Sequence, residues 1–308
     1  IDDIQLPVVV ARLARLAREK RAKVIVGVYP DYHMLAASRY AARLLGLPWV
    51  TYLHDTIAEG LAATPLARRA RRLQAAVFRE ADQIFVMSDG MRRLFARKYA
   101  RDCEALEHTY PERPASVVSD AAEERAFWGG SVYAINDRSV ARVSAALGRV
   151  DWPLEITTTQ TARSLAASGV TGDHVKRSFY PTRAEYLAAM GSAGLLVLAL
   201  NWPDESKLHE DELATIFPTK TPEYLAAGRP ILVHCPEHYF LAEFFREHDC
   251  GVVVSERSTD AIEGALRELW SKPDRAARLM ANSRRALERF DPQRLTTKFR
   301  DGIAAACA

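Results

Sequence analysis

Cysteine is scarce in this sequence of 308 residues and forms no paired pattern. The four cysteines, Cys103, Cys235, Cys250 and Cys307, are scattered, and no two of them stand in a CxxC arrangement. Such usage is typical of reduced thiols in a cytosolic protein and speaks against a disulfide-stapled secreted domain or a zinc site. We therefore expect no disulfide bonds.

Long apolar runs and a dominant charge are missing as well. No stretch approaches the roughly 20 apolar residues that cross a bilayer, and no signal peptide opens the chain. The 42 Lys and Arg nearly balance 39 Asp and Glu, and no basic and aromatic surface for nucleic acid stands out. We expect a cytoplasmic protein, soluble or peripheral to a membrane, that does not bind nucleic acid.

Strands and helices alternate through most of the chain, which predicts an α/β fold. With 48% hydrophobic residues, the chain can fill two cores, so we expect one domain over 1–115, a linker with Pro111 and Pro114, and a second domain over 116–308. The predicted strands are 23–29, 49–54, 84–88, 103–108, 154–160, 175–180, 195–200, 231–235 and 251–256, with one more beside 127–135. The predicted helices are 8–21, 32–46, 62–79, 89–99, 139–150, 162–169, 183–193, 238–248, 273–290 and 292–308.

The stretch Phe217–Glu256 is the most informative part of the sequence. Thr219 is the predicted N-cap of a short helix that Gly228 ends, and the strands 231–235 and 251–256 flank another helix in a βαβ unit. Ligands of such parallel sheets bind beyond the carboxyl ends of the strands, where helix amino termini attract phosphate. Lys220 and Glu223 are predicted at that edge. The alternative is an ordinary surface Lys–Glu pair at a helix start.

This stretch resembles the second domain of GT-B glycosyltransferases, especially the retaining family four. The shared pattern is Pro-x-Lys-x-x-Glu-Tyr-Leu-Ala-x-Gly-x-Pro, running here from Pro218 to Pro230. The resemblance implies two Rossmann-like domains, with Glu223 on the donor ribose and Lys220 on the phosphates. A further family Glu falls here on Thr215, while the acids Glu210, Asp211 and Glu212 lie out of that register.

Two features of the amino-terminal half extend the resemblance. Ala81, Asp82 and Ser88 frame the strand 84–88 as family four commonly frames it. The chain opens at Ile1 with an acidic turn and a helix instead of a strand. We therefore expect the first Rossmann-like domain to be incomplete at its amino terminus.

Paired glycines open the predicted second domain at Gly129 and Gly130. Glycines let backbone amides approach a diphosphate, although a Gly-Gly pair is also an ordinary turn. Family four often places Gly-Ser or Gly-Arg here with a basic residue later. The resemblance thus adds Gly129, Gly130, Ser131 and Arg138 to the predicted donor-binding residues, which also include Thr219, Lys220 and Glu223.

His54 and Asp55 follow the strand 49–54, at the carboxyl edge of the first predicted sheet. In related enzymes a His after this strand lies near the transferred sugar, so the resemblance implies that His54 contacts the donor sugar or the acceptor. Asp55 is a candidate acceptor contact or base. The alternative is that His54 is a structural hydrogen-bonding residue at a strand end.

The helix predicted over 62–79 is basic and amphipathic. Arg68, Arg69, Arg71, Arg72 and Arg79 alternate with an apolar stripe at helical spacing. Family members that act on lipid-linked acceptors can use such a surface against anionic lipid. The alternative is a solvated outer face packed by its apolar stripe.

These features predict a glycosyltransferase that moves a sugar from a nucleotide-sugar donor to a glycan, lipid-linked or small-molecule acceptor. The resemblance implies retention of configuration, with the leaving diphosphate stabilised by Lys220. The sequence has no Asp-x-Asp pattern, which many GT-A enzymes use for a metal, so we expect neither a metal nor a cofactor besides the donor. A GT-B-fold nucleotide-sugar epimerase and a non-catalytic nucleotide-sugar-binding module are the alternatives.

Overall fold

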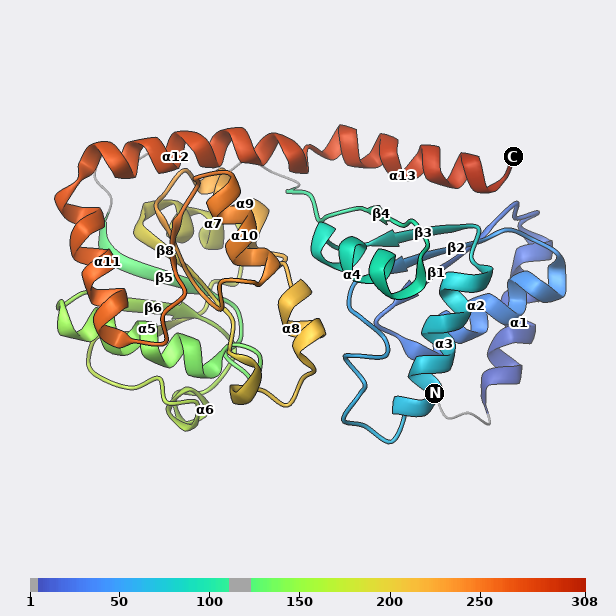
Figure 1. Cartoon of the computed structure of the whole chain (residues 1–308), viewed down its shortest axis with the longest axis horizontal. Coiled ribbons are helices and arrows are strands. Elements are labelled where there is room, and N and C mark those ends of the chain that lie inside the picture. Colours follow the sequence, from blue (N-terminus) through green and yellow to red (C-terminus); the bar gives the residue numbers. More distant parts are fainter. Residues whose placement is uncertain (1–4, 111–122) are drawn as a thin grey trace. The chain divides into compact units, whose positions relative to one another are not determined.

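A computed structural model describes residues 5–110 and 123–308, which form two compact units (Figure 1). The first comprises residues 1–108, 208–216 and 292–308, and the second comprises 109–207 and 217–291. Two segments from the carboxyl-terminal half thus join the first unit. The predicted boundary at 115/116 and the linker prolines Pro111 and Pro114 lie outside the described residues.

The first unit is built around a parallel sheet with strand order β1-β2-β3-β4. Its strands are β1 (Ile25–Tyr29), β2 (Trp49–Leu53), β3 (Gln83–Val86) and the short β4 (Glu104–Ala105). Its helices are α1 (Leu6–Glu19), α2 (Tyr32–Leu45), α3 (Ala67–Glu80), α4 (Asp89–Tyr99), α8 (Glu210–Thr215) and α13 (Pro292–Ala306).

Polar side chains in the βα turns of this unit cap the helices that follow. Asp31 accepts a hydrogen bond from the Met34 N–H at the start of α2, and Ser88 accepts one from the Met91 N–H at the start of α4. Gly46 ends α2 in the left-handed conformation with φ 62°. The carboxyl ends of β1, β2 and β3 therefore lead directly into loops and helix starts at one edge of the sheet.

The prediction of a helix over 62–79 is wrong at its start, because α3 begins only at Ala67. Thr64 precedes Pro65, and a residue before proline is disfavoured in the helical conformation. The Thr64 hydroxyl instead donates to the Leu61 carbonyl and accepts from the Leu66 N–H, which makes a turn.

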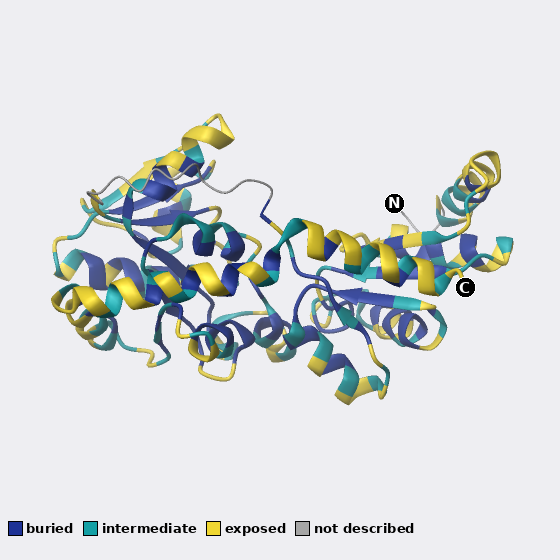
Figure 2. Ribbon diagram, turned by 90° about the horizontal axis from the view of Figure 1, so that it is seen from above, coloured by how far each residue is buried: buried dark blue, intermediate teal, exposed yellow. Residues whose placement is uncertain are grey.

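α13 packs on the first sheet. Leu295 lies in one buried cluster with Val50 of β2 and Phe85 of β3, and Phe299 and Ile303 pack against that cluster. The last helix of the chain therefore belongs to the first unit. Figure 2 shows the buried residues of the strands beneath helices that expose one side.

The second unit holds a parallel sheet with strand order β10-β9-β8-β5-β6-β7. Its strands are β5 (Glu123–Gly129), β6 (Leu154–Thr157), β7 (Val175–Ser178), β8 (Ala193–Ala199), β9 (Ile231–His234) and β10 (Val252–Val254). The helices are α5 (Asp137–Arg149), α6 (Ala162–Ala167), α7 (Arg183–Ser192), α9 (Thr221–Ala227), α10 (Phe240–Glu247), α11 (Thr259–Ser271) and α12 (Pro273–Leu287), with 3-10 turns η2 (Pro203–Glu205) and η3 (Glu288–Phe290).

This strand order contains a switch point. The chain runs from β5 through β6 to β7 on one side, and then returns to the other side of β5 with β8, β9 and β10. In open α/β sheets, ligands bind in the crevice outside the carboxyl ends of the strands at such a point. Gly129, at the end of β5, stands at this position.

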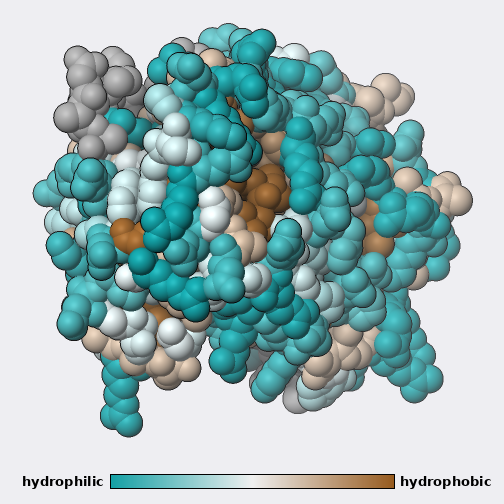
Figure 3. All heavy atoms as spheres, turned by 60° about the vertical axis from the view of Figure 1, so that its left-hand side comes forward, coloured by the Kyte–Doolittle hydropathy of each residue, from teal (hydrophilic) through white to brown (hydrophobic). Residues whose placement is uncertain are grey.

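Hydrophobic side chains of the second unit gather inside it. β5, β6 and β8 bring Trp128, Ile156 and Val197 together with Val143 of α5 and Leu266 of α11. In the space-filling view of Figure 3, hydrophilic residues cover most of the visible face, and strongly hydrophobic residues show mainly in recesses.

Candidate functional site

Gly129 closes β5 where two helices come close to the backbone. A Cβ on this residue would lie 2.3 Å from the Tyr186 hydroxyl oxygen of α7. The Gly129 N–H donates to the Tyr224 hydroxyl oxygen of α9 at 2.9 Å. Gly130 follows with φ 110°, a conformation that side chains rarely adopt. Both glycines are therefore required by the local geometry of this turn.

The two glycine amides point into the fold in this structure. The Gly129 N–H is taken by Tyr224, and the Gly130 N–H donates to the Thr157 carbonyl at 2.9 Å. Ser131, next in the loop before α5, is exposed. The backbone amides of the glycine pair are thus engaged within the second unit, and the exposed part of the loop begins at Gly130.

Lys220 lies directly at this turn. Its Nζ donates to the Gly129 carbonyl at 2.9 Å and stands 3.3 Å from the centroid of the Trp128 ring. Burial of the ammonium group lowers the pKa of Lys220 to about 7, since a desolvated cation is less stable than the neutral amine. The sequence-based expectation that Lys220 reaches the edge of the second sheet near the paired glycines therefore matches this geometry.

The prediction that Thr219 caps the following helix is wrong. α9 begins at Thr221, its N-cap is Lys220, and no side chain caps it. Pro222 supplies the preset backbone angle of the first turn, so the helix starts without a polar cap. Thr219 is exposed, whereas Thr221 is buried and its hydroxyl has no hydrogen-bond partner among the described residues. Gly228 ends α9 in the left-handed conformation, as predicted.

Glu223 lies in the first turn of α9 and already has a cationic partner. Its Oε1 accepts a hydrogen bond from Arg183 of α7 at 2.8 Å, and 18% of the Glu223 side chain is exposed. Sequence reasoning did not predict this role for Arg183.

Arg138, in the first turn of α5, is exposed. No contact in the described part of the chain brings Arg138 to Lys220.

Side-chain contacts hold the segment Asn201–Asp204 in place at the end of β8. Asn201 is buried, and its amide donates to Asp137 at 2.7 Å. Asp204 accepts two hydrogen bonds from Arg257, at 2.6 and 2.8 Å. Trp202 stacks under the guanidinium of Arg142, 4.8 Å away. These contacts fix the strand edge beside the Gly129 turn.

In the first unit, His54 and Asp55 follow β2 at the carboxyl edge of the sheet. The His54 N–H donates to the Tyr29 carbonyl, and its ring lies 5.2 Å from the ring of His108. Burial lowers the pKa of His54, because a desolvated imidazolium is less stable than the neutral imidazole. Desolvation by the surrounding protein raises the pKa of Asp55, and His108 nearby opposes that rise.

The residue after Asp55 is held by an acid that sequence reasoning set aside. The Thr56 N–H donates to Glu212 Oε2 at 3.0 Å, and the Thr56 hydroxyl donates to the same oxygen. Glu212 lies in α8, and burial raises its pKa to about 7. No local sequence pattern indicates this contact, because 156 positions separate the two residues.

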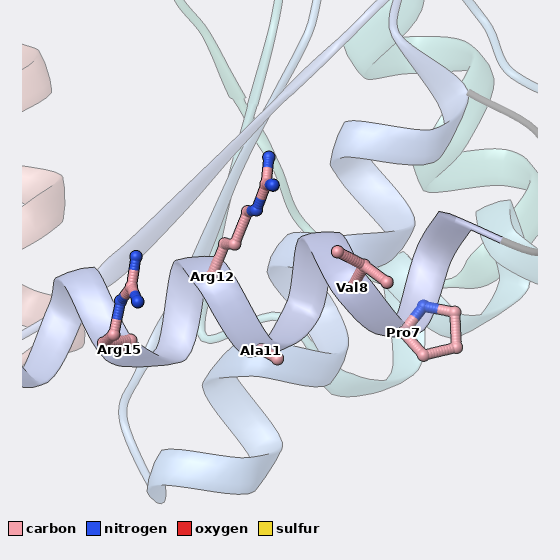
Figure 4. Close-up of a pocket in the computed structure, with 5 residues that line it drawn as sticks. All are labelled: Pro7, Val8, Ala11, Arg12 and Arg15. Atoms are coloured by element: carbon pink, nitrogen blue, oxygen red, sulfur yellow. The ribbon is translucent and has the colours of Figure 1, made fainter.

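The α1 surface has a separate hollow. Pro7, Val8, Ala11, Arg12 and Arg15 line it, and Figure 4 shows Arg12 and Arg15 extending from the same side of the helix. None of the predicted site residues lies there.

In residues 5–110 and 123–308, no three or more His, Cys, Asp or Glu side chains are grouped to hold a metal ion. No helix within the same ranges has the length and hydrophobicity to span a membrane. All four cysteines are free thiols, and only Cys307 is exposed.

Two parallel, Rossmann-like sheets make up the GT-B fold, and the protein has this fold. Residues 4–105 match the family model described as "Glycosyl transferase 4-like domain". The α/β class with two Rossmann-like domains is thereby confirmed. No curated protein matches the sequence.

Solved structures with the same fold share little sequence with this chain. A sucrose-phosphate synthase from Thermosynechococcus elongatus is 17% identical, with a TM-score of 0.69 over 97% of this chain and 78% of that chain. A glycosyltransferase from Rickettsia africae is 9% identical, with a TM-score of 0.67 over 99% and 82%. Anabaena HepE, solved in complex with UDP-glucose, is 14% identical, with a TM-score of 0.71 over 96% and 82%.

Proposed function

We propose that the protein transfers a sugar from a nucleotide-sugar donor to a glycan, lipid-linked or small-molecule acceptor. The observation that carries this proposal is the position of Lys220, whose ammonium group lies against the last residue of β5 at the switch point of the second sheet. A cation at that place suits the diphosphate of a nucleotide sugar. The glycosyl transferase 4-like domain of the first unit supports the same class of reaction.

The donor is proposed to bind along the turn that follows β5. Glu223 would accept the ribose hydroxyls, and this requires its pair with Arg183 to open or to be shared with the ligand. Ser131 and Arg138 are exposed and would approach the phosphates from the loop and from α5. HepE was solved with UDP-glucose, so uridine nucleotides are the first donors to test.

Lys220 is proposed to act in the chemical step. As the glycosidic bond breaks, negative charge grows on the leaving phosphate, and a cation already in place stabilises that charge without reorganising. The pKa of Lys220 lies near 7 without ligand, and the diphosphate would raise it and so favour the protonated form. We propose retention of configuration and no dependence on a metal, with the leaving phosphate taking the acceptor proton.

His54 and Asp55 are proposed to contact the acceptor or the transferred sugar. A neutral imidazole can both donate and accept hydrogen bonds to hydroxyl groups, which suits a sugar. Asp55 is exposed and can accept a hydrogen bond from an acceptor hydroxyl.

The test is UDP release from UDP-glucose in the presence of a panel of mono- and oligosaccharides, with Lys220→Met beside the parent. We expect kcat to fall by more than the donor KM rises, because only contacts made in the transition state raise the chemical rate. The parent and Lys220→Met must have the same melting temperature. Parental kcat and KM in Lys220→Met would overturn the proposal.

The same assay separates the alternatives. An epimerase would convert the nucleotide sugar to its epimer with no acceptor present. A binding module would shift its melting temperature with UDP-glucose, yet release no UDP under any condition. Added EDTA leaves the rate unchanged if the reaction needs no metal.

We further propose a peripheral contact with the inner membrane surface through α3. Ala70, Leu73 and Val77 are buried in the first unit, so the apolar stripe packs on the protein itself. The arginines Arg68, Arg69, Arg71 and Arg72 are exposed. Cations near an anionic surface contribute roughly 1 kcal/mol each, so electrostatics alone would hold this face to lipid.

A further inference from the structure

α8 belongs to the carboxyl-terminal half of the sequence and yet packs in the first unit. It lies between β8 and α9 in the chain, and both of these elements belong to the second unit. Within the first unit it packs on α4, where the Ser88 hydroxyl donates to the Thr215 carbonyl at 2.9 Å. A segment that leaves one unit to dock in the other needs a contact that fixes it there.

Glu212 provides that contact by binding the loop formed by residues 54–60, which we call the β2 loop. Only 5% of Glu212 is exposed, and Thr56 is fully buried. One carboxylate oxygen of Glu212 accepts the N–H and the hydroxyl of Thr56, and the same hydroxyl oxygen accepts the Gly60 N–H at 3.1 Å. The carboxylate therefore ties the beginning of the loop to its end.

The middle of the β2 loop is held independently. Gln74 of α3 accepts the N–H groups of Ile57 and Ala58, both at 2.9 Å. The same amide donates to the buried carboxylate of Glu59. Gln74 and Glu212 therefore share the backbone amides of this loop, and Glu212 holds the part next to Asp55.

Acidic groups crowd this place. Asp55 and Glu59 of the loop lie near Glu212 and act on its charge. The phenol of Tyr29 from β1 also lies near Glu212. Lys98 of α4 forms an ion pair with Glu59. Asp211 stands on α8 itself, and its charge acts on Lys98. Burial first, and then the neighbouring carboxylates, raise the pKa of Glu212 to about 7, while the hydrogen bonds from Thr56 oppose that rise.

We infer that Glu212 is a positioning residue that fixes the β2 loop through Thr56 and so sets the place of His54 and Asp55. The chain is held at His54 by the hydrogen bond from its backbone N–H to the Tyr29 carbonyl. It is held directly after Asp55 by the hydrogen bond from the Thr56 N–H to Glu212. This inference rests on the proposed function, since it gives His54 and Asp55 their acceptor.

The sign of the pH effect follows from the raised pKa. The carboxyl group of Glu212 is protonated more readily when the β2 loop is docked on it than when the loop is open. Its contribution to the docked loop is therefore complete below the ordinary pKa of 4.5 and is lost as pH rises through about 7. The docked loop therefore opens more often at pH 8 than at pH 5. The opening equilibrium changes by up to roughly two orders of magnitude.

Hydrogen–deuterium exchange of the backbone amides of Thr56 and Gly60, corrected for intrinsic exchange, tests the geometry without any ligand. Glu212→Ala is expected to speed exchange by at least about tenfold at pH 6, because Thr56 loses its acceptor. Glu212→Gln retains a carbonyl oxygen for the Thr56 N–H and has no proton to lose. It is expected to exchange like the parent at pH 5 and to lose the pH dependence.

The exposed Glu210 on the same helix supplies a matched control, since Glu210→Gln is expected to keep the parental profile. Parental exchange in Glu212→Ala, or an unchanged pH profile in Glu212→Gln, would overturn the inference.

A kinetic arm uses UDP-glucose with the saccharide panel. Glu212→Ala is expected to raise the acceptor KM at least about fivefold with the donor KM unchanged, and Glu212→Gln is expected to rescue it. Faster exchange with a parental acceptor KM would also overturn the positioning role. If the parent protein neither binds UDP-glucose nor releases UDP, the proposed function fails on its own, while the exchange data still decide whether Glu212 holds the loop.

Discussion

Lys220 is the residue on which the account depends. The Lys220 cation lies against an aromatic ring and one carbonyl, and no carboxylate of the described residues contacts it. Desolvation lowers its pKa and leaves it ready for an anion. Structural lysines at an exposed helix start show neither feature. The contacts of Lys220 thus favour a binding role over the surface pair that the sequence also allowed.

Glu223 provides the prediction at the residue scale. Glu223→Ala is expected to weaken UDP-glucose binding by roughly 1–3 kcal/mol, because a hydrogen bond from the ribose to a charged group is lost. Isothermal titration calorimetry measures this change. Folding should be little affected, since the lost pair with Arg183 is partly exposed.

Arg183→Met supplies the matched control, because it breaks the same ion pair and leaves the carboxylate of Glu223 in place. A ribose contact predicts that Arg183→Met binds UDP-glucose at least as well as the parent. Equal losses in both variants would assign the effect to the ion pair, and unchanged binding in Glu223→Ala would refute the ribose contact.

Sequence reasoning found some residues of the site and missed others for a physical reason. Lys220 and Gly129 could be placed together because parallel strands end at one sheet edge. Tyr186, Arg183 and Glu212 could not, since their contacts join elements that lie far apart in the chain and depend on how helices pack over the sheet.

At the scale of elements, the turn after β5 is the most constrained feature. Gly129→Ala places a Cβ 2.3 Å from the Tyr186 hydroxyl oxygen and 3.1 Å from the ring carbon that carries it, which is closer than ordinary van der Waals contact. We expect a loss of about 1–3 kcal/mol in the free energy of unfolding. Urea unfolding measures it, and adding Tyr186→Phe should recover part of the loss because the clashing oxygen is gone.

Gly130→Ala separates the two reasons for glycine in this turn. A Cβ there would meet nothing within 4 Å, but its φ is 110°, so any cost comes from the backbone. Tyr186→Phe should therefore not rescue Gly130→Ala.

Additive losses for Gly129→Ala and Tyr186→Phe, within about 0.5 kcal/mol, would show that the two residues do not interact.

The elements themselves were largely predictable, and the errors have local causes. The alternation of β-branched strands with amphipathic helices indicated the parallel sheets. The start of α3 was missed because Pro65 disfavours the helical conformation at Thr64. The cap of α9 was assigned to Thr219, although that helix begins at Thr221 with Pro222 in its first turn and no side-chain cap. The docking of α8 in the first unit was unpredictable, since its six residues carry no strong periodicity.

At the scale of the whole molecule, the arginine face of α3 makes a testable surface. Reversing Arg68, Arg69, Arg71 and Arg72 to Glu is expected to abolish sedimentation with anionic vesicles, because the attraction becomes repulsion. Soluble-substrate activity should survive. Binding of the parent should also weaken at higher salt.

A control for that experiment comes from α12. Arg284 and Arg285 are exposed there, and their reversal to Glu is expected to leave sedimentation unchanged. If both variants sediment like the parent, or if the parent does not sediment, the α3 face is a solvated surface.

The most direct test of the donor site counts protons taken up when UDP binds. Near pH 8 most Lys220 is neutral, and the diphosphate should restore its charge, so titrations in buffers of different ionisation enthalpy should show uptake of about one proton per site. At pH 6 the uptake should nearly vanish, and Lys220→Met should show none at pH 8. A donor site at Lys220 predicts this difference between parent and variant, whereas equal proton uptake in the two, or parental UDP affinity in Lys220→Met, would contradict it.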